Sequence, residues 1–96
     1  MSQNEQYTKV VVITTEEIIE QELIEDLNRL GVKGYTIWEV HGKGDRGIRS
    51  SDMFAVGNIR VEIACSDEMA KDIKALVNKK YAKNFAMLLY GYTIEV

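Results

Sequence analysis

Residues 9–30, KVVVITTEEIIEQELIEDLNRL, decide the fold because they join a buried strand directly to an amphipathic helix. Residues 9–13 form a short β-branched run, which is typical of a strand that is apolar on both faces. Residues 14–17 resemble a capping box, in which the Thr14 hydroxyl and the Glu17 carboxylate satisfy free amides at a helix start. The helix predicted next stops at Gly31, and its apolar face comprises Ile19, Leu23, Ile24, Leu27 and Leu30.

The remaining segments predict three more strands and a second helix. Residues 35–41 are rich in aromatic and β-branched side chains, and residues 59–65 alternate between apolar and polar, so both predict strands. Ser66 or Asp67 caps the second helix, which turns inward Met69, Ile73, Leu76 and Val77. Residues 86–96 predict a last strand that places on one face Ala86, Leu88, Tyr90, Tyr92, Ile94 and Val96. The order βαββαβ predicts an α+β, ferredoxin-like fold, an antiparallel four-stranded sheet with two helices on one face.

The sheet face opposite the helices is also expected to be apolar. Val10 and Val12 point away from Val11 and Ile13, and Trp38 adds further apolar surface. Covering several hundred Å² of such surface stabilises a protein by several kcal/mol, at about 25 cal/mol per Å². Association of copies through this face is the economical explanation, and a monomer with polar lining there is the alternative.

Composition excludes several classes of protein. The 96 residues predict one domain, residues 1–96, and a net charge of -3 argues against nucleic-acid binding. Cys65 is the single cysteine and lies in an apolar strand, so we expect a buried, inert thiol. No apolar run approaches the roughly 20 residues that span a bilayer. Residues 1–6 lack the features of a signal peptide, so we expect a cytoplasmic protein.

Residues 42–57 predict a long loop, and its first part carries the chemistry. The stretch 42–51, GKGDRGIRSS, sets three cations against one carboxylate in an otherwise acidic chain. Glycine lets backbone amides approach an anion closely, and arginine matches phosphate oxygens in pairs. The segment therefore predicts a site for a phosphate or another small oxyanion. A basic surface loop without a ligand is the alternative.

Other site chemistries do not fit the sequence. The loop lacks the Lys-Ser/Thr end of a Walker motif, and a strand rather than a helix follows it. His41 is the only histidine and has no cysteine nearby, so it cannot assemble a structural zinc site. No serine or cysteine nucleophile can be placed with a partnered base. We therefore expect neither a metal site nor catalytic residues.

Residues 9–96 resemble the PII-like superfamily over nearly their whole length. GVKGYT at 31–36 is similar to the turn into the family's second strand, and GKGDRGIRSS is similar to the start of its T-loop in one branch. Residues 80–81 and 84–86 also resemble that branch. It comprises the carboxysome-associated PII proteins and the PII-like regulator of the sodium-dependent bicarbonate transporter.

This resemblance implies a homotrimer that binds an adenine nucleotide in clefts between subunits. Among the adenine nucleotides, AMP and ADP are expected as ligands in preference to ATP and cyclic AMP. It places Thr36 near the adenine edge and Ile59 against the base. Leu89 and Tyr90 would line the base pocket from an adjoining subunit. The residues implied to hold phosphates, or a neighbouring bicarbonate, are Gly42, Lys43, Gly44, Arg46 and Arg49.

The resemblance also implies a non-enzymatic signalling protein whose T-loop, residues 42–57, binds a partner. Nucleotide would change the order of this loop and so control inorganic-carbon uptake through a membrane bicarbonate transporter, or another partner. The partner-binding residues implied are Ser51, Met53, Phe54 and Val56. Folding of these apolar residues back onto the domain is the alternative.

Three departures from family patterns narrow the expectation. Residues 51–58 lack the modifiable tyrosine of nitrogen-regulatory PII proteins, so uridylylation is not expected. The glycine-rich phosphate loop after the second helix is missing, which argues against tight triphosphate binding. No cysteine-bearing extension follows Val96, so redox control there is not expected.

Three other classes of protein share parts of this pattern. Acylphosphatases have the same element order, but they need a phosphate loop after the first strand and an arginine in the first helix, where this chain is acidic. An RNA-recognition motif needs stacked aromatics on its third strand, and residues 60–63 have none. A metal-linked trimer of CutA type shares the fold but not the Gly-Lys-Gly-Asp-Arg loop.

Overall fold

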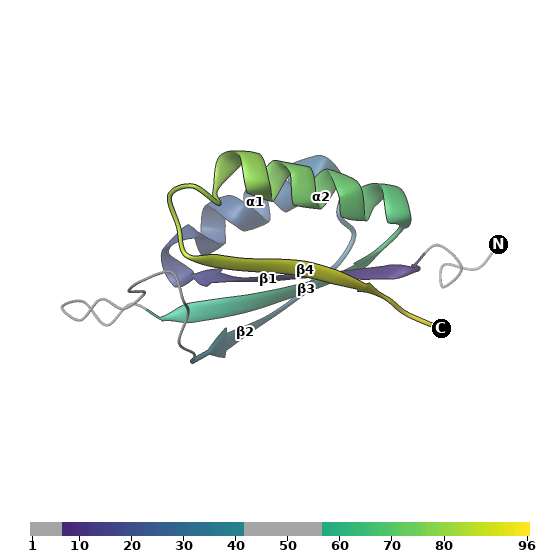
Figure 1. Ribbon diagram of the computed structural model, residues 1–96, viewed down its shortest axis with the longest axis horizontal. Coiled ribbons are helices and arrows are strands. Elements are labelled where there is room, and N and C mark those ends of the chain that lie inside the picture. Colours follow the sequence, from purple (N-terminus) through teal and green to yellow (C-terminus); the bar gives the residue numbers. More distant parts are fainter. Residues whose placement is uncertain (1–6, 42–56) are drawn as a thin grey trace.

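A computed structural model describes residues 7–41 and 57–96. The strand order in the sheet is β2-β3-β1-β4, with every neighbouring pair antiparallel, and both helices cover one face (Figure 1). This arrangement confirms the predicted α+β, ferredoxin-like fold. Its elements are β1 (Lys9–Glu16), the 3-10 helix η2 (Glu17–Ile19), α1 (Glu20–Leu30), β2 (Thr36–Val40), β3 (Asn58–Cys65), α2 (Asp67–Lys80) and β4 (Met87–Thr93).

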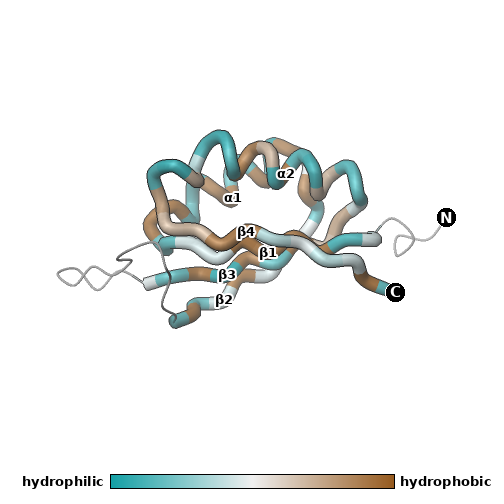
Figure 2. The backbone as a smooth tube through the Cα atoms, in the orientation of Figure 1, coloured by the Kyte–Doolittle hydropathy of each residue, from teal (hydrophilic) through white to brown (hydrophobic). Residues whose placement is uncertain are grey.

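The core lies between the sheet and the helices. Alternate residues of β1 and β3 point toward the helices, as strand geometry requires, and are buried there. Each fully buried aliphatic side chain contributes roughly 1.5–3 kcal/mol. Figure 2 shows the matching pattern, with apolar residues on the inner sides of the helices. The core side chains include Val11, Ile13, Ile59, Val61, Ile63, Leu23, Leu27, Ile73 and Val77.

Two predicted helix boundaries are confirmed by their hydrogen bonds. Gly31 ends α1 in the left-handed conformation, with φ of 101°, and its N–H donates to the carbonyls of Asn28 and Leu27. Ser66 caps α2, since its Oγ accepts a hydrogen bond of 3.1 Å from the Met69 N–H. Cys65 is buried immediately before this cap, as expected.

The predicted capping box at residues 14–17 is wrong. β1 continues to Glu16, and α1 begins only at Glu20, after the 3-10 turn and without a side-chain cap. The polar side chains of this segment bind Ala86 instead, just before β4. Thr15 Oγ1 donates to the Ala86 carbonyl at 2.9 Å, and a Glu16 carboxylate oxygen accepts from the Ala86 N–H at 2.7 Å. These contacts hold β1 in the sheet where the local pattern predicts a helix start.

The last strand is shorter than predicted. β4 ends at Thr93, so Ile94 and Val96 lie beyond the ladder, although the Ile94 N–H still donates to the Thr8 carbonyl at 3.0 Å. The strand pairs with β1 only from Lys9 to Thr15. β4 therefore ends at Thr93, because Thr93 pairs with Lys9, the first residue of β1.

The sheet face away from the helices, which we call the open face, carries large apolar side chains. Trp38, Leu88, Tyr90 and Tyr92 are 44%, 56%, 39% and 43% exposed. Val12 is nevertheless fully buried, because it lies between Glu62 of β3 and Tyr90 of β4. The prediction that both faces of the first strand are apolar is thus confirmed.

A polar cluster joins α1 to the end of α2. Asp26 is only 7% exposed, and its carboxylate accepts hydrogen bonds from Tyr81 Oη at 2.5 Å, Lys80 Nζ at 2.8 Å and Arg29 at 3.3 Å. Burial alone raises the pKa of Asp26, but the hydrogen bonds from Lys80 and Tyr81 outweigh it and lower that pKa. Burial and the bond to Asp26 raise the pKa of Tyr81. The ionised carboxylate is therefore the form that fixes the end of α2.

We expect Asp26→Asn to lower the free energy of unfolding by about 1–3 kcal/mol at pH 7, since a buried carboxylate loses charge-assisted bonds. The folded pKa lies below the unfolded one, so this stabilisation is present above the unfolded pKa and lost as pH falls through the folded pKa. The difference between wild type and variant in urea denaturation should hence shrink below about pH 4.

Glu22→Gln is the matched control, because the Glu22 carboxylate pairs with Lys80 but is 58% exposed. It should change stability by less than about 0.5 kcal/mol. An Asp26→Asn difference that is the same at pH 3 and pH 7 would contradict the role given to the charge.

Candidate ligand-binding site

The candidate site lies along β2, the edge strand of the sheet. Among the described residues β2 pairs only with β3, so its outer backbone groups face away from the sheet. Its five residues span about 13 Å from Thr36 to Val40. One end follows Tyr35, and the other leads through the exposed His41 into residues 42–56. The strand therefore connects the predicted base-binding residue to the predicted phosphate loop.

A cavity of about 230 Å³ lies at the Thr36 end of this strand. We call it the β2 slot. The residues that line it include Thr36, with a hydroxyl, and Glu62, with a carboxylate, which occupy opposite positions on β2 and β3. Cavities for drug-sized ligands are about 300–1,000 Å³, so the slot has room for a heterocyclic base but not for a whole nucleotide. The slot is lined by Tyr7, Val10, Gly34, Tyr35, Thr36, Glu62 and Ala64.

The electrostatics of the slot are set by an ion pair beside it. Arg60 Nη2 donates to the Glu62 carboxylate at 2.8 Å, and both side chains lie on the open face of β3. Glu62 is thus a hydrogen-bond acceptor among the residues that line the slot, opposite Thr36 in the strand register. Two neighbouring oxygens on an apolar floor suit a planar ring with an amino group on its edge.

The structure separates the other predicted base-binding residues from Thr36. The Ile59 side chain is fully buried against the helices, on the face of β3 opposite Glu62, so it is not part of the slot. Leu89 and Tyr90 lie on β4, at the other edge of the sheet. Leu89 packs against the core and Tyr90 is on the open face. Within one chain they cannot line the same cavity as Thr36.

The predicted phosphate-binding and partner-binding residues of the loop lie outside the described residues. They are Gly42, Lys43, Gly44, Arg46, Arg49, Ser51, Met53, Phe54 and Val56. Gly57, directly after them, is tied to the first residue of η2. Its carbonyl accepts from the Glu17 N–H at 2.9 Å, and a Cβ at Gly57 would lie 2.8 Å from Glu17 Oε1. A side chain at position 57 would therefore displace the Glu17 carboxylate, which is the flexible end of its side chain.

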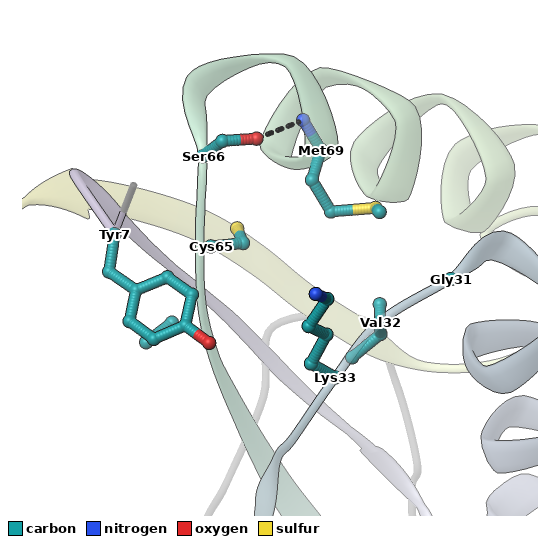
Figure 3. A pocket seen from close by; sticks show the side chains of 8 residues that line it. Tyr7, Gly31, Val32, Lys33, Cys65, Ser66 and Met69 are labelled. Atoms are coloured by element: carbon teal, nitrogen blue, oxygen red, sulfur yellow. Dashed lines mark hydrogen bonds between the residues drawn. The ribbon is translucent and has the colours of Figure 1, made fainter. Parts of the chain in front are cut away.

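A second, smaller cavity of about 90 Å³ shares Tyr7 and Ala64 with the β2 slot. Figure 3 shows its lining, in which Cys65 lies below the Ser66 cap of α2. Burial raises the pKa of the Cys65 thiol, and Asp67 raises it further. Both effects favour the neutral thiol over the thiolate, which agrees with the buried thiol expected in an apolar strand.

Two further findings concern the described part of the chain alone. Residues 7–41 and 57–96 contain no group of three histidine, cysteine, aspartate or glutamate side chains that could hold a metal ion. In the same ranges no helix has the length and apolar character that crossing a membrane requires.

Of the residues that line the slot, Thr36 is the only one that sequence analysis predicted to bind a ligand, and that role stays a prediction. The signal that could have found Glu62 and Ala64 is their alternation with the core residues of β3, which puts them on the open face. Their position beside Thr36 needs the β2–β3 register, which the sequence does not display. Tyr7 was missed because it precedes the predicted strand.

Comparison with solved structures shows the same fold in several PII-like proteins. A PII-like signalling protein from Thermus thermophilus is 39% identical to this chain, with a TM-score of 0.77. The alignment covers 93% of this chain and 88% of the Thermus thermophilus chain. CPII, a nitrogen regulatory PII-like protein from Thiomonas intermedia bound to ADP, AMP and bicarbonate, is 21% identical over 93% of each chain, with a TM-score of 0.68. The structure of CPII bound to ADP, AMP and acetate is 20% identical, with a TM-score of 0.72, and the alignment covers 95% of this chain and 91% of the CPII chain.

The family model for nitrogen regulatory protein P-II matches residues 7–95. That range includes every described helix and strand. The Thermus thermophilus protein, at 39% identity, covers 93% of this chain. The chain therefore belongs to the P-II family of regulatory proteins.

Proposed function

We propose that this protein is a non-enzymatic, trimeric sensor of adenine nucleotides. The observation that carries the proposal is the β2 slot, a base-sized cavity with two oxygen acceptors at one end of an exposed edge strand. The other end of that strand opens into a glycine- and arginine-rich segment. A nucleotide laid along β2 would meet an apolar slot at its base and cations at its phosphates.

The slot favours adenine through its acceptors. The Thr36 hydroxyl and the Glu62 carboxylate can both accept a hydrogen bond from an exocyclic amino group. Tyr35 and Tyr7 add aromatic surface for the ring. The binding of ADP and AMP by CPII, which has the same fold, supports this choice of ligand.

The phosphates would bind the loop that follows β2. Gly42 lies two residues beyond Val40, so a phosphate group placed about 13 Å from the slot would reach the start of the loop. Gly42 and Gly44 would offer backbone amides, and Lys43, Arg46 and Arg49 would offer charge. We favour AMP and ADP over ATP because no second glycine-rich loop follows α2. The bicarbonate bound by CPII supports a second, small-oxyanion role for the same cations.

The open face supports the trimer. Trimeric assembly is typical of the P-II family, and here Trp38, Leu88 and Tyr92 present exposed apolar surface away from the helices. Burial of that surface between copies would stabilise the assembly. Assembly would also bring the β4 edge of one copy, with Leu89 and Tyr90, toward the β2 edge of another. The base would then be enclosed by two subunits.

The output of the sensor is assigned to residues 42–57. Ligand contacts made by Arg46 and Arg49 would change the conformation of the loop, and Ser51, Met53, Phe54 and Val56 would then bind or release a partner. A membrane bicarbonate transporter is the partner that the sequence resemblance favours, which would place the protein in inorganic-carbon control. A single, buried cysteine fits a reducing compartment, and we place the protein in the cytoplasm.

Arg46→Ala should weaken ADP binding by about 10- to 150-fold, the effect of losing one charge-assisted phosphate contact. It should leave adenosine binding and thermal stability unchanged, since the arginine would contact only phosphate. Isothermal titration calorimetry measures both ligands. Lys71→Ala removes an exposed cation from α2 and is the matched control. An unchanged ADP affinity in Arg46→Ala would place the phosphates elsewhere.

Thr36→Val keeps the shape of the residue but removes the hydroxyl from the slot. We expect ADP, AMP and adenosine to bind about 5- to 15-fold more weakly, because the lost hydrogen bond is to the base that all three share. Thr93→Val, at the exposed end of β4, is the control. Equal affinities for wild type and Thr36→Val would exclude the β2 slot as the base site.

A further inference from the structure

A groove of about 480 Å³ runs along η2 and the first two turns of α1, and it is larger than the β2 slot. We call it the α1 groove. The helices cover the sheet face opposite the open face, so the groove is not part of the surface that the proposed trimer covers (Figure 1). The groove is lined by Glu17, Ile18, Glu20, Gln21, Ile24 and Glu25.

Two isoleucines make the α1 groove partly apolar. Ile18 is 72% exposed, the highest fraction among the exposed large apolar residues of the described chain, and Ile24 is partly buried. Packing of η2 does not require Ile18, because the adjacent Ile19 is buried in the core. One exposed apolar side chain is common on a protein surface, but two that line a single groove indicate a surface that another molecule covers.

The α1 groove is also acidic. Of the described residues that line it, three are glutamates and none is a lysine or arginine. Within residues 7–41 and 57–96, Glu17, Glu20 and Glu25 take part in no ion pair, whereas Lys80 pairs with Glu22 outside the groove. The helix dipole favours acidic residues in the first turn of α1, but Glu25 lies in the second. The charge of the groove therefore suits a cationic partner.

The dimensions of the groove suit a short helix. From residue 17 to residue 25 it is about 12 Å long, at 1.5 Å per residue, which equals about two turns of a partner helix. An amphipathic helix presents apolar side chains at positions i and i+3 or i+4, with cations beside them. An extended segment has less to bind, because the backbone groups of a helix are largely used within the helix.

We propose that the α1 groove binds a cationic amphipathic helix of a partner protein. Ile18 and Ile24 contact its apolar side chains, and the three glutamates pair with its lysines or arginines. The Glu17 N–H binds the Gly57 carbonyl at 2.9 Å, so the groove begins where the segment assigned to output joins the fold. The inference rests on the proposed function for the regulatory role of the protein, and it adds the chemistry of the partner.

Two synthetic peptides test the recognition. One is a fluorescein-labelled peptide of leucine and lysine, about 14 residues long, with its leucines on one helix face. The other has the same composition in an order that spreads the leucines around the helix. In fluorescence anisotropy the full chain should bind the first peptide at least about tenfold more tightly, because only that peptide places its apolar face on the isoleucines.

The apolar part of the contact is tested by Ile18→Ser. This change should weaken binding of the amphipathic peptide at least about fivefold, since an apolar contact is lost. Val96→Ser is the matched control, because Val96 is 70% exposed and lies far from the groove in the sequence. It should change the affinity by less than about twofold. Equal effects of the two changes would overturn the proposal.

The charged part is tested by the double variant Glu20→Gln, Glu25→Gln. It should weaken binding at least about fivefold and make the remaining affinity less sensitive to salt, since two ion pairs are lost. Glu68→Gln with Asp72→Asn removes the same charge from exposed positions of α2 and is the matched control. An equal loss in both double variants would mean attraction by net charge alone and would overturn the proposal.

The peptide assay contains no nucleotide, so its failure is distinct from that of the proposed function. A wild-type protein that binds ADP but neither peptide, or both peptides equally, would overturn the α1 groove as a docking site and leave the sensor intact. A protein that distinguishes the peptides but binds no ADP would support the groove and refute the nucleotide sensor. Ile18→Ser should bind ADP as tightly as wild type in calorimetry, and a weaker affinity would contradict the separation of the two surfaces.

Discussion

The position of β1 between β3 and β4 is the constraint on which the rest of the structure depends. The strand is buried along both faces, so Val11 and Ile13 hold the helices while Val10 and Val12 support the open face. A shift of its register by one residue would exchange these two faces and place valines where the core is already filled. Thr15 and Glu16 make that register specific, because both backbone groups of Ala86 bind their side chains.

This central pairing leaves β2 and β4 as the two edges of the sheet. Each edge carries a part of the proposed site, Thr36 on one and Leu89 with Tyr90 on the other. A single chain keeps these parts apart, whereas a ring of chains can bring one edge against the next. The same geometry explains why an apolar open face and a base-sized slot occur together. Both are completed by neighbouring copies in our account of the trimer.

The sequence predicts the fold well because the deciding signals are local. Alternation in β3, the left-handed glycine at Gly31 and the Ser66 cap each depend on residues within one turn or one strand. The error at residues 14–17 arises because Thr15 and Glu16 bind a residue about 70 positions away, which no local pattern reveals. Among the residues that line the slot, only Thr36 was predicted as a binding residue, since Glu62 and Ala64 come beside it through the cross-strand register.

The central claim is that this member of the P-II family binds adenine nucleotide as an assembly of three chains. Native mass spectrometry with increasing ADP tests both parts of it in one spectrum. The account predicts a species of three chains that takes up ADP in steps to a maximum of three. A monomer that binds ADP alone, or a trimer that binds none while the protein is folded, would contradict it.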